Sequence, residues 1–471
     1  MEIGSIKRLS FIHRAHTYVT QAPTDRRWVN LVGSLGVVAA SSSFLLERDV
    51  MRAGELLMFV ALLAALPAAW RFFRTNPAFW LFLIWVAALA LSNSLVMADP
   101  AIPTDHNIWN AARHWSRVGW IPLMAWLIAG RLGIVKTVFF CYTAAWFAAT
   151  LPELSPDLLR ASLEGARLDF GTGNPHRAAL PFMITTLILG FLARDWVGPG
   201  PRVQSTFLFL TRLTLWGLAL AYSTFGLFSA QGAGPVGGAV TASLIGLFVL
   251  WRHLTEGKPL FVKLRLLAVG AGALVVIAAG LAIAFKPAID SRLATFSGGL
   301  SELSEGEIVS EGGTVGARYY LWTFAFEKWA ERPLTGYGTE SAQSLIPVSE
   351  LPERTRQFNH LHNSFLELTF STGLLGAAIL LVFFAHISQK VIRSVKEKKT
   401  PKRYGTLYFG LLIAFILANS GESYIVFSHF WPHLALISAG FYSLALFSRP
   451  RRSTNAHHTC YSPEHAAGKP S

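Results

Sequence analysis

Long apolar stretches alternate with short polar ones along most of this 471-residue chain. A helix that spans a bilayer needs about 20 mostly apolar residues, and about twelve windows approach or reach that length. They lie near residues 28–46, 54–70, 79–97, 117–130, 134–151, 178–193, 204–222, 234–251, 266–285, 363–387, 406–421 and 431–447. The pattern predicts an all-α polytopic membrane protein of about twelve transmembrane helices, nine within 28–286 and three within 362–448.

One polar stretch is far longer than the others. It covers residues 287–361, between the predicted helices 9 and 10, whereas packed helices are usually joined by about 2–8 residues. Its first part, 297–313, is rich in Gly, Ser and Glu and is predicted to be mobile. The pattern over 314–331 predicts a helix, which Pro333 ends, followed by a turn at 334–338. We therefore expect a large, partly helical loop with a functional role.

Composition and charge support a membrane protein and give it an orientation. The chain is 52% hydrophobic and only 14% charged, whereas soluble domains carry about 25% charged residues. Its net charge of +14 comes from Lys and Arg concentrated in the short links on one side of the predicted bundle. The positive-inside rule makes that side cytoplasmic. It includes the N-terminal segment 1–27 and a tail, 449–471, that is predicted to be disordered, so the large loop is predicted to be periplasmic.

The same distribution argues against nucleic-acid binding, because the basic residues follow the predicted topology. The two cysteines, Cys141 and Cys460, lie in an apolar window and in the tail, where neither a disulfide nor a metal site is expected. No cleavable signal peptide is expected either, since the first apolar window is long enough to anchor the chain.

The end of the large loop brings polar groups to the mouth of the predicted tenth helix. His360, His362 and Asn363 lie where the sequence changes from polar to apolar. Gly373 and Gly376 follow three residues apart and are predicted to share one helix face, where small residues let a neighbouring helix approach. Histidine can act as a base near neutral pH, so this junction is a candidate site.

A second loop on the same side, 151–176, carries further candidates. Arg167 precedes a tight Gly/Asn/Pro run that contains Asn174, and Arg177 leads directly into the next apolar window. Arginine binds phosphate oxygens through two parallel hydrogen bonds. The loop is therefore predicted to contact an anion.

Three of these segments resemble motifs of the O-antigen ligase family. His362-Asn363, nine residues and Gly373-Leu374-Leu375-Gly376 resemble its signature. Arg318 and Trp322, four residues apart and followed by a Pro-Gly turn at 333–338, resemble its Arg-x-x-x-Trp helix. Arg167 with 171–175 is similar to its earlier periplasmic loop. The superfamily also includes O-antigen polymerases and oligosaccharyltransferases that glycosylate proteins.

The chain departs from the family pattern at one corner. Where the family often has Ser-Arg-Gly, near the outer ends of the seventh and eighth helices, this chain has Ala230-Gln231-Gly232. Gln231 is uncharged, so the role of that arginine is lost here or has moved to Arg212 or Arg177. Arg212 lies inside an apolar window, where an ionisable residue is costly and usually functional, although it could also snorkel to an interface.

The resemblance implies an O-antigen ligase in the bacterial inner membrane. It would transfer a glycan from undecaprenyl diphosphate to lipid A–core oligosaccharide at the periplasmic face, with inversion and without a metal or a cofactor. A base must take the acceptor hydroxyl proton, and fixed positive charge must stabilise the leaving diphosphate; His362 and Arg318 are the expected catalytic residues. The expected substrate-binding residues are Arg167, Arg177, Asn174, Gln231, His360, Asn363, Trp322 and Arg212.

Three alternatives stay open at this point. An O-antigen polymerase would use the same donor with a second lipid-linked repeat as acceptor, and an oligosaccharyltransferase would use a protein. A polytopic transporter or flippase belongs to a different class. The chain shows no internal repeat and no matched pair of broken helices in two halves, which are typical of many transporters.

Overall fold

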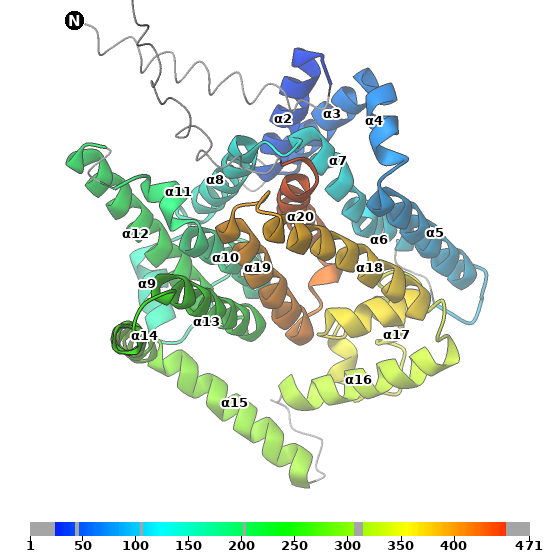
Figure 1. The fold of residues 1–471 in the computed structure, drawn as a ribbon. Helices are drawn as coiled ribbons and strands as arrows, with labels where there is room; N and C mark the ends of the chain where they lie inside the picture. The colour runs from blue at the N-terminus through cyan, green and yellow to red at the C-terminus, as the bar shows by residue number, and fades with distance from the viewer. Residues whose placement is uncertain (1–23, 43–46, 104–106, 201–203, 306–313, 449–471) are drawn as a thin grey trace, which may run out of the picture.

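The computed structural model describes residues 24–42, 47–103, 107–200, 204–305 and 314–448, and every regular element in those ranges is helical. The predicted tail 449–471 and nearly all of the segment 1–27 lie outside them. The helices (Figure 1) are α2 (Arg27–Ser41), α3 (Glu47–Ala64), α4 (Leu66–Phe73), α5 (Pro77–Met97), α6 (Ile108–Trp115), η2 (Ser116–Gly119), α7 (Trp120–Ile128), α8 (Leu132–Thr150), α9 (Pro156–Leu163), α10 (Pro175–Phe191), α11 (Ala193–Val197), α12 (Thr206–Ser229), α13 (Ala233–Thr255), α14 (Leu260–Ala284), α15 (Lys286–Glu305), α16 (Thr314–Glu331), α17 (Ala342–Leu345), η3 (Thr355–Gln357), α18 (Ser364–Lys396), α19 (Lys402–Gly421), η4 (Tyr424–Val426) and α20 (Phe430–Phe447).

Eight of the described helices are long and apolar enough to cross a membrane by length and composition, which confirms an all-helical, multi-pass membrane protein. They are α5, α8, α12, α13, α14, α18, α19 and α20. A ninth span is possible if α3 and α4, bent by 92° at their junction, cross as one unit. The predicted count of about twelve is not confirmed. Three apolar windows form shorter helices instead: α2 has 15 residues, α7 has 9 and α10 has 17.

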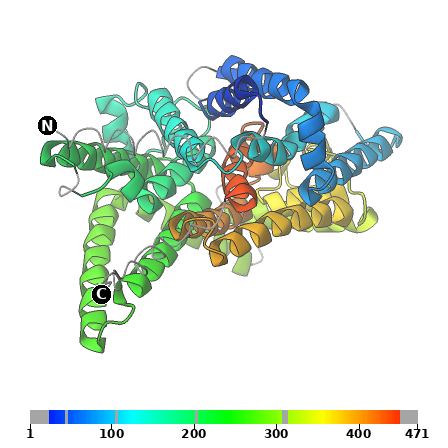
Figure 2. The same cartoon turned by 45° about the horizontal axis from the view of Figure 1, so that its top comes forward.

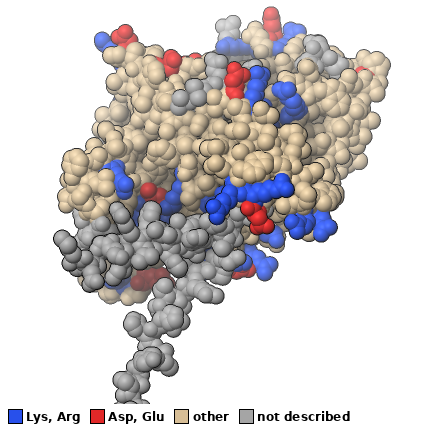
Figure 3. All heavy atoms as spheres, turned by 90° about the horizontal axis from the view of Figure 1, so that it is seen from above, with Lys and Arg blue, Asp and Glu red and all other residues tan. Residues whose placement is uncertain are grey.

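Two of these shorter helices, α7 and α10, pack inside the bundle. Most of α7 and α10 is buried, and α7 packs beside α20. On the face shown in Figure 3, charged side chains gather along two opposite edges and leave an uncharged band between them. Such a band is the expected surface of a protein whose flanks contact lipid.

Helix α14 stands apart from this bundle. None of its 25 residues is buried, and it contacts mainly its sequence neighbours α13 and α15. Figure 1 shows α14 end-on, whereas α15 runs across the view; Figure 2 shows α14 and α15 projecting from the body of the molecule. An apolar helix that contacts so little of the described protein is suited to contact with lipid.

The segment 287–361 is more ordered than the sequence predicts. The helix predicted over 314–331 is confirmed as α16, with the same bounds. Residues 297–305, part of the stretch predicted to be mobile, continue α15 as a helix, and 306–313 lie outside the described residues; the mobility itself stays a prediction. The segment also forms a small core of its own against α5 and α18, with buried side chains that include Leu321, Phe324, Tyr337, Ile346, Leu361 and Phe370.

The predicted turn after Pro333 inserts into a break in α18. The backbone of Gly373 has φ 63° and ψ −173°, a region that essentially only glycine occupies. At this break, backbone groups of α18 form hydrogen bonds with the turn and not within the helix. Leu374 N–H donates to the Pro333 carbonyl at 2.8 Å, and Tyr337 N–H donates to the Phe370 carbonyl at 2.9 Å. The prediction that Gly373 and Gly376 share one face of a continuous helix is therefore wrong. Gly373 interrupts the helix so that the turn can join it.

Candidate active site

The two histidines of the junction lie side by side just before α18. The ring centroids of His360 and His362 are 4.1 Å apart. His362 has φ 52°, in the left-handed region that residues with a Cβ rarely adopt; strained residues of this kind cluster at active sites. Asn363 is the N-cap of α18, and its side chain accepts hydrogen bonds from two backbone N–H groups of the first turn, at 3.0 and 3.2 Å. This cap fixes where the helix begins and so where His362 lies.

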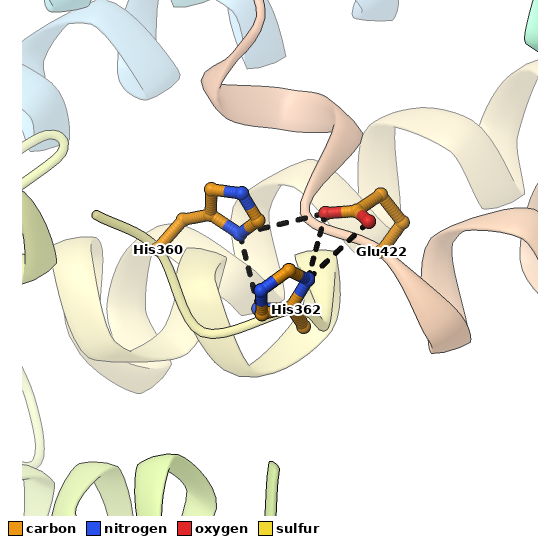
Figure 4. A group of neighbouring side chains, drawn as sticks. All are labelled: His360, His362 and Glu422. Atoms are coloured by element: carbon orange, nitrogen blue, oxygen red, sulfur yellow. Dashed lines mark hydrogen bonds and ion pairs between the residues drawn. The ribbon is translucent and has the colours of Figure 1, made fainter. Parts of the chain in front are cut away.

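Glu422 faces both histidines from the end of α19 (Figure 4). One of its oxygens lies 3.2 Å from His362 Nδ1 and 3.4 Å from His360 Nδ1. Its other oxygen lies 3.3 Å from Nε2 of His176, which begins α10. The Glu422 side chain is 3% exposed, against 17% for His362. Three histidines on two separate segments therefore converge on one nearly buried carboxylate.

The surroundings keep this carboxylate ionised and His360 neutral. Burial raises the pKa of Glu422, but the hydrogen bond of His362 and the charges of His362, His176 and His360 together outweigh burial and lower that pKa to about 2. Burial and the neighbouring His362 lower the pKa of His360 to about 4. An ionised Glu422 stabilises a proton on the facing nitrogen of His362, which is the arrangement that a histidine base requires.

Glu367, fully buried one turn into α18, fastens this arrangement. One of its oxygens accepts the N–H of Leu361 at 2.8 Å and the hydroxyl of Ser423 at 3.2 Å. Ser423 in turn donates its backbone N–H to Glu422 at 3.1 Å. The Glu367 carboxylate thus ties the histidine turn to the segment that carries Glu422.

Arg167 and Arg318 lie near the histidines, and Arg292 lies near both of these arginines. Arg318, on α16, donates to the carbonyl of Gly421 at 3.0 Å. Arg167 Nη2 lies 3.2 Å from His176 Nε2. Burial lowers the pKa of Arg167, and the nearby charge of Arg292 lowers it further. Burial and the nearby charge of Arg318 lower the pKa of Arg292 in the same way. Guanidinium groups keep their charge in proteins, so the site concentrates positive charge with one carboxylate opposite it.

Gln231 lies at the edge of this positive cluster. Its backbone has φ 51°, and its side chain donates to the carbonyls of Gly165 and Ala166 at 2.9 and 3.3 Å. Nη2 of Arg292 lies 3.5 Å from its backbone carbonyl. Arg292, on α15, therefore brings positive charge to the corner where Gln231 replaces the expected arginine.

The other predicted residues differ in what they contact. Asn174 caps α10 and accepts from His176 N–H at 2.8 Å. The guanidinium of Arg177 lies 5.3 Å from the ring centre of Phe427, whose ring is also next to His360. Trp322 donates its indole N–H to the carbonyl of Leu361 at 2.9 Å. These three residues border or support the histidine turn.

Arg212 is not brought to the site. It lies in the first turns of α12, where it donates to Gln204 at 3.3 Å, whereas Gln231 follows the opposite end of that helix. A helix rises 1.5 Å per residue, so about 25 Å separates Arg212 from the corner that holds Gln231.

The structure adds three residues that the sequence reasoning did not assign to the site: His176, Arg292 and Glu422. His176 follows the Gly/Asn/Pro run directly, and Arg292 and Glu422 each come within a few residues of the end of a long apolar window. The sequence signal that could have indicated these site residues is an ionisable residue near the end of a membrane-spanning window. It is weak, because interfacial anchors share it.

The same groups offer ligands for a metal ion. Within the described ranges, one nitrogen each of His360 and His362 and one oxygen of Glu422 lie within 4.8 Å of one another. Imidazole and carboxylate are ligands that zinc and related ions accept. The donor set therefore fits both a hydrogen-bonded base and a metal site.

Residues 218–381, about a third of the chain, match the O-antigen ligase family. The matched region contains Gln231, Arg292, Arg318 and His362; Arg167, His176 and Glu422 lie outside it.

A distant relative is the exopolysaccharide production protein ExoQ of Rhizobium meliloti (strain 1021). It is 27% identical over 204 residues, and the aligned part covers 42% of this chain and 42% of that protein.

Proposed function

Because the chain belongs to the O-antigen ligase/polymerase superfamily, we propose that this membrane protein is an O-antigen ligase. It transfers a glycan from undecaprenyl diphosphate to lipid A–core oligosaccharide in the bacterial inner membrane. The observation that carries the proposal is the His362–Glu422 pair, set among Arg167, Arg292 and Arg318 at the ends of long apolar helices.

The proposed reaction divides the work between the base and the arginines. The acceptor hydroxyl gives its proton to His362 Nε2 as its oxygen attacks the anomeric carbon, and the ionised Glu422 stabilises the imidazolium from Nδ1. His362 Nε2 is buried and has no hydrogen-bond partner among the described residues, so a hydroxyl that reaches it satisfies an otherwise costly group. The bond from the anomeric carbon to the diphosphate breaks on the opposite face, which inverts that carbon.

The arginines stabilise the leaving diphosphate. Negative charge grows on the diphosphate as the bond breaks, and fixed guanidinium groups stabilise it more in the transition state than in the ground state. Arg318, Arg292 and Arg167 supply this charge, and Arg177 borders the same region. No step of this scheme requires a metal or a cofactor.

Three features support a periplasmic site. The basic links lie on the opposite side of the predicted bundle, which the positive-inside rule assigns to the cytoplasm. In the proposed reaction the undecaprenyl-linked glycan is used at the outer leaflet. The segment 287–361 is too polar to lie in lipid. Both termini would then be cytoplasmic.

The test uses purified protein in nanodiscs, a lipid-linked glycan donor and lipid A–core acceptor. His362→Ala should abolish transfer while its elution profile and melting temperature match those of the parent protein. His253→Ala, which changes an exposed histidine in the last turn of α13, should leave transfer unchanged. Near-parental transfer by His362→Ala would contradict the base assignment.

An O-antigen polymerase is the second candidate, and the similarity to a protein of exopolysaccharide production favours it. A host deleted for the gene separates the two. Under the ligase proposal, lipid A–core loses all O-antigen and long chains accumulate on the undecaprenyl carrier. If single repeat units still reach the core, the protein is a polymerase.

A further inference from the structure

We infer that His360, His362 and Glu422 form a binding site for a divalent transition-metal ion such as Zn²⁺, and that an ion bound there stops glycan transfer. The binding half stands on geometry alone. The inhibitory half rests on the proposed function, because it requires His362 to be the base.

The spacing of the ligand atoms matches a tetrahedral ion. Zinc binds histidine nitrogen at about 2.0–2.1 Å and carboxylate oxygen at about 2.0–2.2 Å, so two ligands of one tetrahedral ion lie roughly 3.3–3.5 Å apart. Glu422 Oε1 lies 3.2 Å from Nδ1 of His362 and 3.4 Å from Nδ1 of His360. Two of the three distances between ligand atoms therefore already suit a tetrahedral ion. The third, between the two histidine nitrogens, is within 4.8 Å, and small side-chain rotations shorten it to the same range.

The setting holds the ligands in place. The side chains of His360, His362 and Glu422 are 11%, 17% and 3% exposed, so the site is largely enclosed. Glu367 anchors the histidine turn through the N–H of Leu361, and ligands fixed by a second layer of hydrogen bonds bind metal more tightly. His176 Nε2 lies 3.3 Å from the other Glu422 oxygen and 3.2 Å from Arg167 Nη2, outside the group of three ligand atoms, so a water molecule would complete the tetrahedron.

The chemistry of these ligands selects the kind of ion. Two imidazoles and one carboxylate suit zinc, copper and nickel, whereas magnesium prefers an octahedron of oxygens and keeps its waters. The neighbouring Arg167 and Arg318 repel a cation, which lowers affinity. We therefore expect a micromolar site that responds to an excess of the ion.

A bound ion blocks the base through its tautomer. A neutral imidazole carries one proton, and a metal on Nδ1 of His362 forces that proton onto Nε2. Nε2 then donates a hydrogen bond and cannot accept the hydroxyl proton of the acceptor. The ion also occupies the Glu422 oxygen that would stabilise the imidazolium, so it removes both halves of the base.

Binding is tested on the protein alone. The full-length protein in nanodiscs is stripped with EDTA, dialysed and titrated with ZnCl₂ by calorimetry; one saturable site is expected, with MgCl₂ giving no heat. Loss of second-layer partners costs about 10–100-fold in affinity, so loss of a ligand in Glu422→Gln should weaken binding by at least about tenfold. His253→Ala, the matched exposed histidine, should bind as the parent protein does.

Visible absorption of added Co²⁺ gives a second measurement on the unmodified protein, should Glu422→Gln fail to fold. Intense bands are expected for a four-coordinate ion, and ZnCl₂ should remove them. The absence of saturable Zn²⁺ binding, or undiminished binding by folded Glu422→Gln, would overturn the site.

Inhibition is then measured separately. The stripped protein should transfer glycan without added metal, saturating Zn²⁺ should lower the initial rate at least tenfold, and EDTA should restore it. Zinc that binds as expected but leaves transfer unchanged would overturn the inhibitory half of the inference. Stripped protein that is inactive yet binds zinc normally would contradict the metal-independent function proposed above, while the site itself stands.

Discussion

Part of the Arg318 guanidinium is already hydrogen-bonded within the protein. One of its nitrogens donates to the Gly421 carbonyl, and its charge acts on His176 and His360. A hydrogen bond from a charged donor contributes about 1.5–3 kcal/mol. Arg318→Lys keeps the charge but loses the fork, so we expect kcat/KM for transfer to fall roughly 10- to 100-fold, and Arg318→Gln to fall further.

The control for this prediction is Arg354→Lys, which changes an exposed arginine of the same segment and should leave kcat/KM unchanged. Full-rate transfer by Arg318→Gln would show that Arg318 does not serve the diphosphate.

Glu340 makes the stability of the fold depend on pH. It has φ 58°, and burial raises its pKa from 4.5 to about 7. Between these values the folded state binds more protons than the unfolded state, so stability falls as pH rises through that window and is level above it. Replacing Glu340 by Gln removes a cost of roughly 3 kcal/mol at pH 8 and little at pH 4.

The measurement is the melting temperature of Glu340→Gln relative to the parent protein, in nanodiscs, from pH 4.5 to 8. The variant should gain on the parent as pH rises, and Glu350→Gln, at an exposed position, should not. An equal difference at every pH would refute the burial of an ionisable Glu340.

At the scale of elements, the decisive contact joins the turn at 333–338 to the break in α18. A Cβ added to Gly373 would lie 2.2 Å from the backbone of Leu334, and the φ of 63° is itself unfavourable for any other residue. Because the obstacle is backbone, no rotamer change relieves it. We expect Gly373→Ala to destabilise the protein by about 2–4 kcal/mol and to lower transfer, since α18 carries Glu367 and follows His362.

Gly270→Ala is the matched control for this substitution. Gly270 lies in α14, and an added Cβ there meets nothing within 4 Å, so the melting temperature should stay the same or rise slightly with helix propensity. An unchanged melting temperature for Gly373→Ala would mean that the turn does not hold the break.

This contact also shows where sequence reasoning ends. Apolar periodicity was sufficient to predict α16 to the residue and the approximate positions of the long spans, because both follow from local pattern. It could not predict the break at Gly373, since a helix glycine and a helix-breaking glycine look alike without the partner segment. The lengths of α7 and α10 depend in the same way on how the bundle packs.

The residues of the candidate site also differ in whether the sequence alone could predict them. His362 and Arg318 each lie in a short local motif, so the sequence was sufficient to predict them as site residues. Glu422 reaches His362 from 60 residues away, and Arg292 reaches Gln231 from 61 residues away. Such pairs depend on tertiary packing, which leaves no local pattern.

At the scale of the whole molecule, the proposal depends on sidedness. The histidine turn and the basic link 390–403 lie at opposite ends of α18, so one is periplasmic if the other is cytoplasmic. The positive-inside rule assigns the basic link to the cytoplasm. Single cysteines can test this assignment, because the chain has only Cys141 and Cys460 to replace.

In a Cys141→Ser, Cys460→Ser background, Glu350→Cys should react with a membrane-impermeant maleimide in intact spheroplasts, and Lys398→Cys should react only after permeabilisation. Both positions are exposed, so a difference in labelling reports the side of the membrane and not burial. The reverse pattern would place His362 and Glu422 on the cytoplasmic side. An acceptor presented at the outer leaflet could not reach them there, and transfer to lipid A–core at the periplasmic face would be ruled out for this chain.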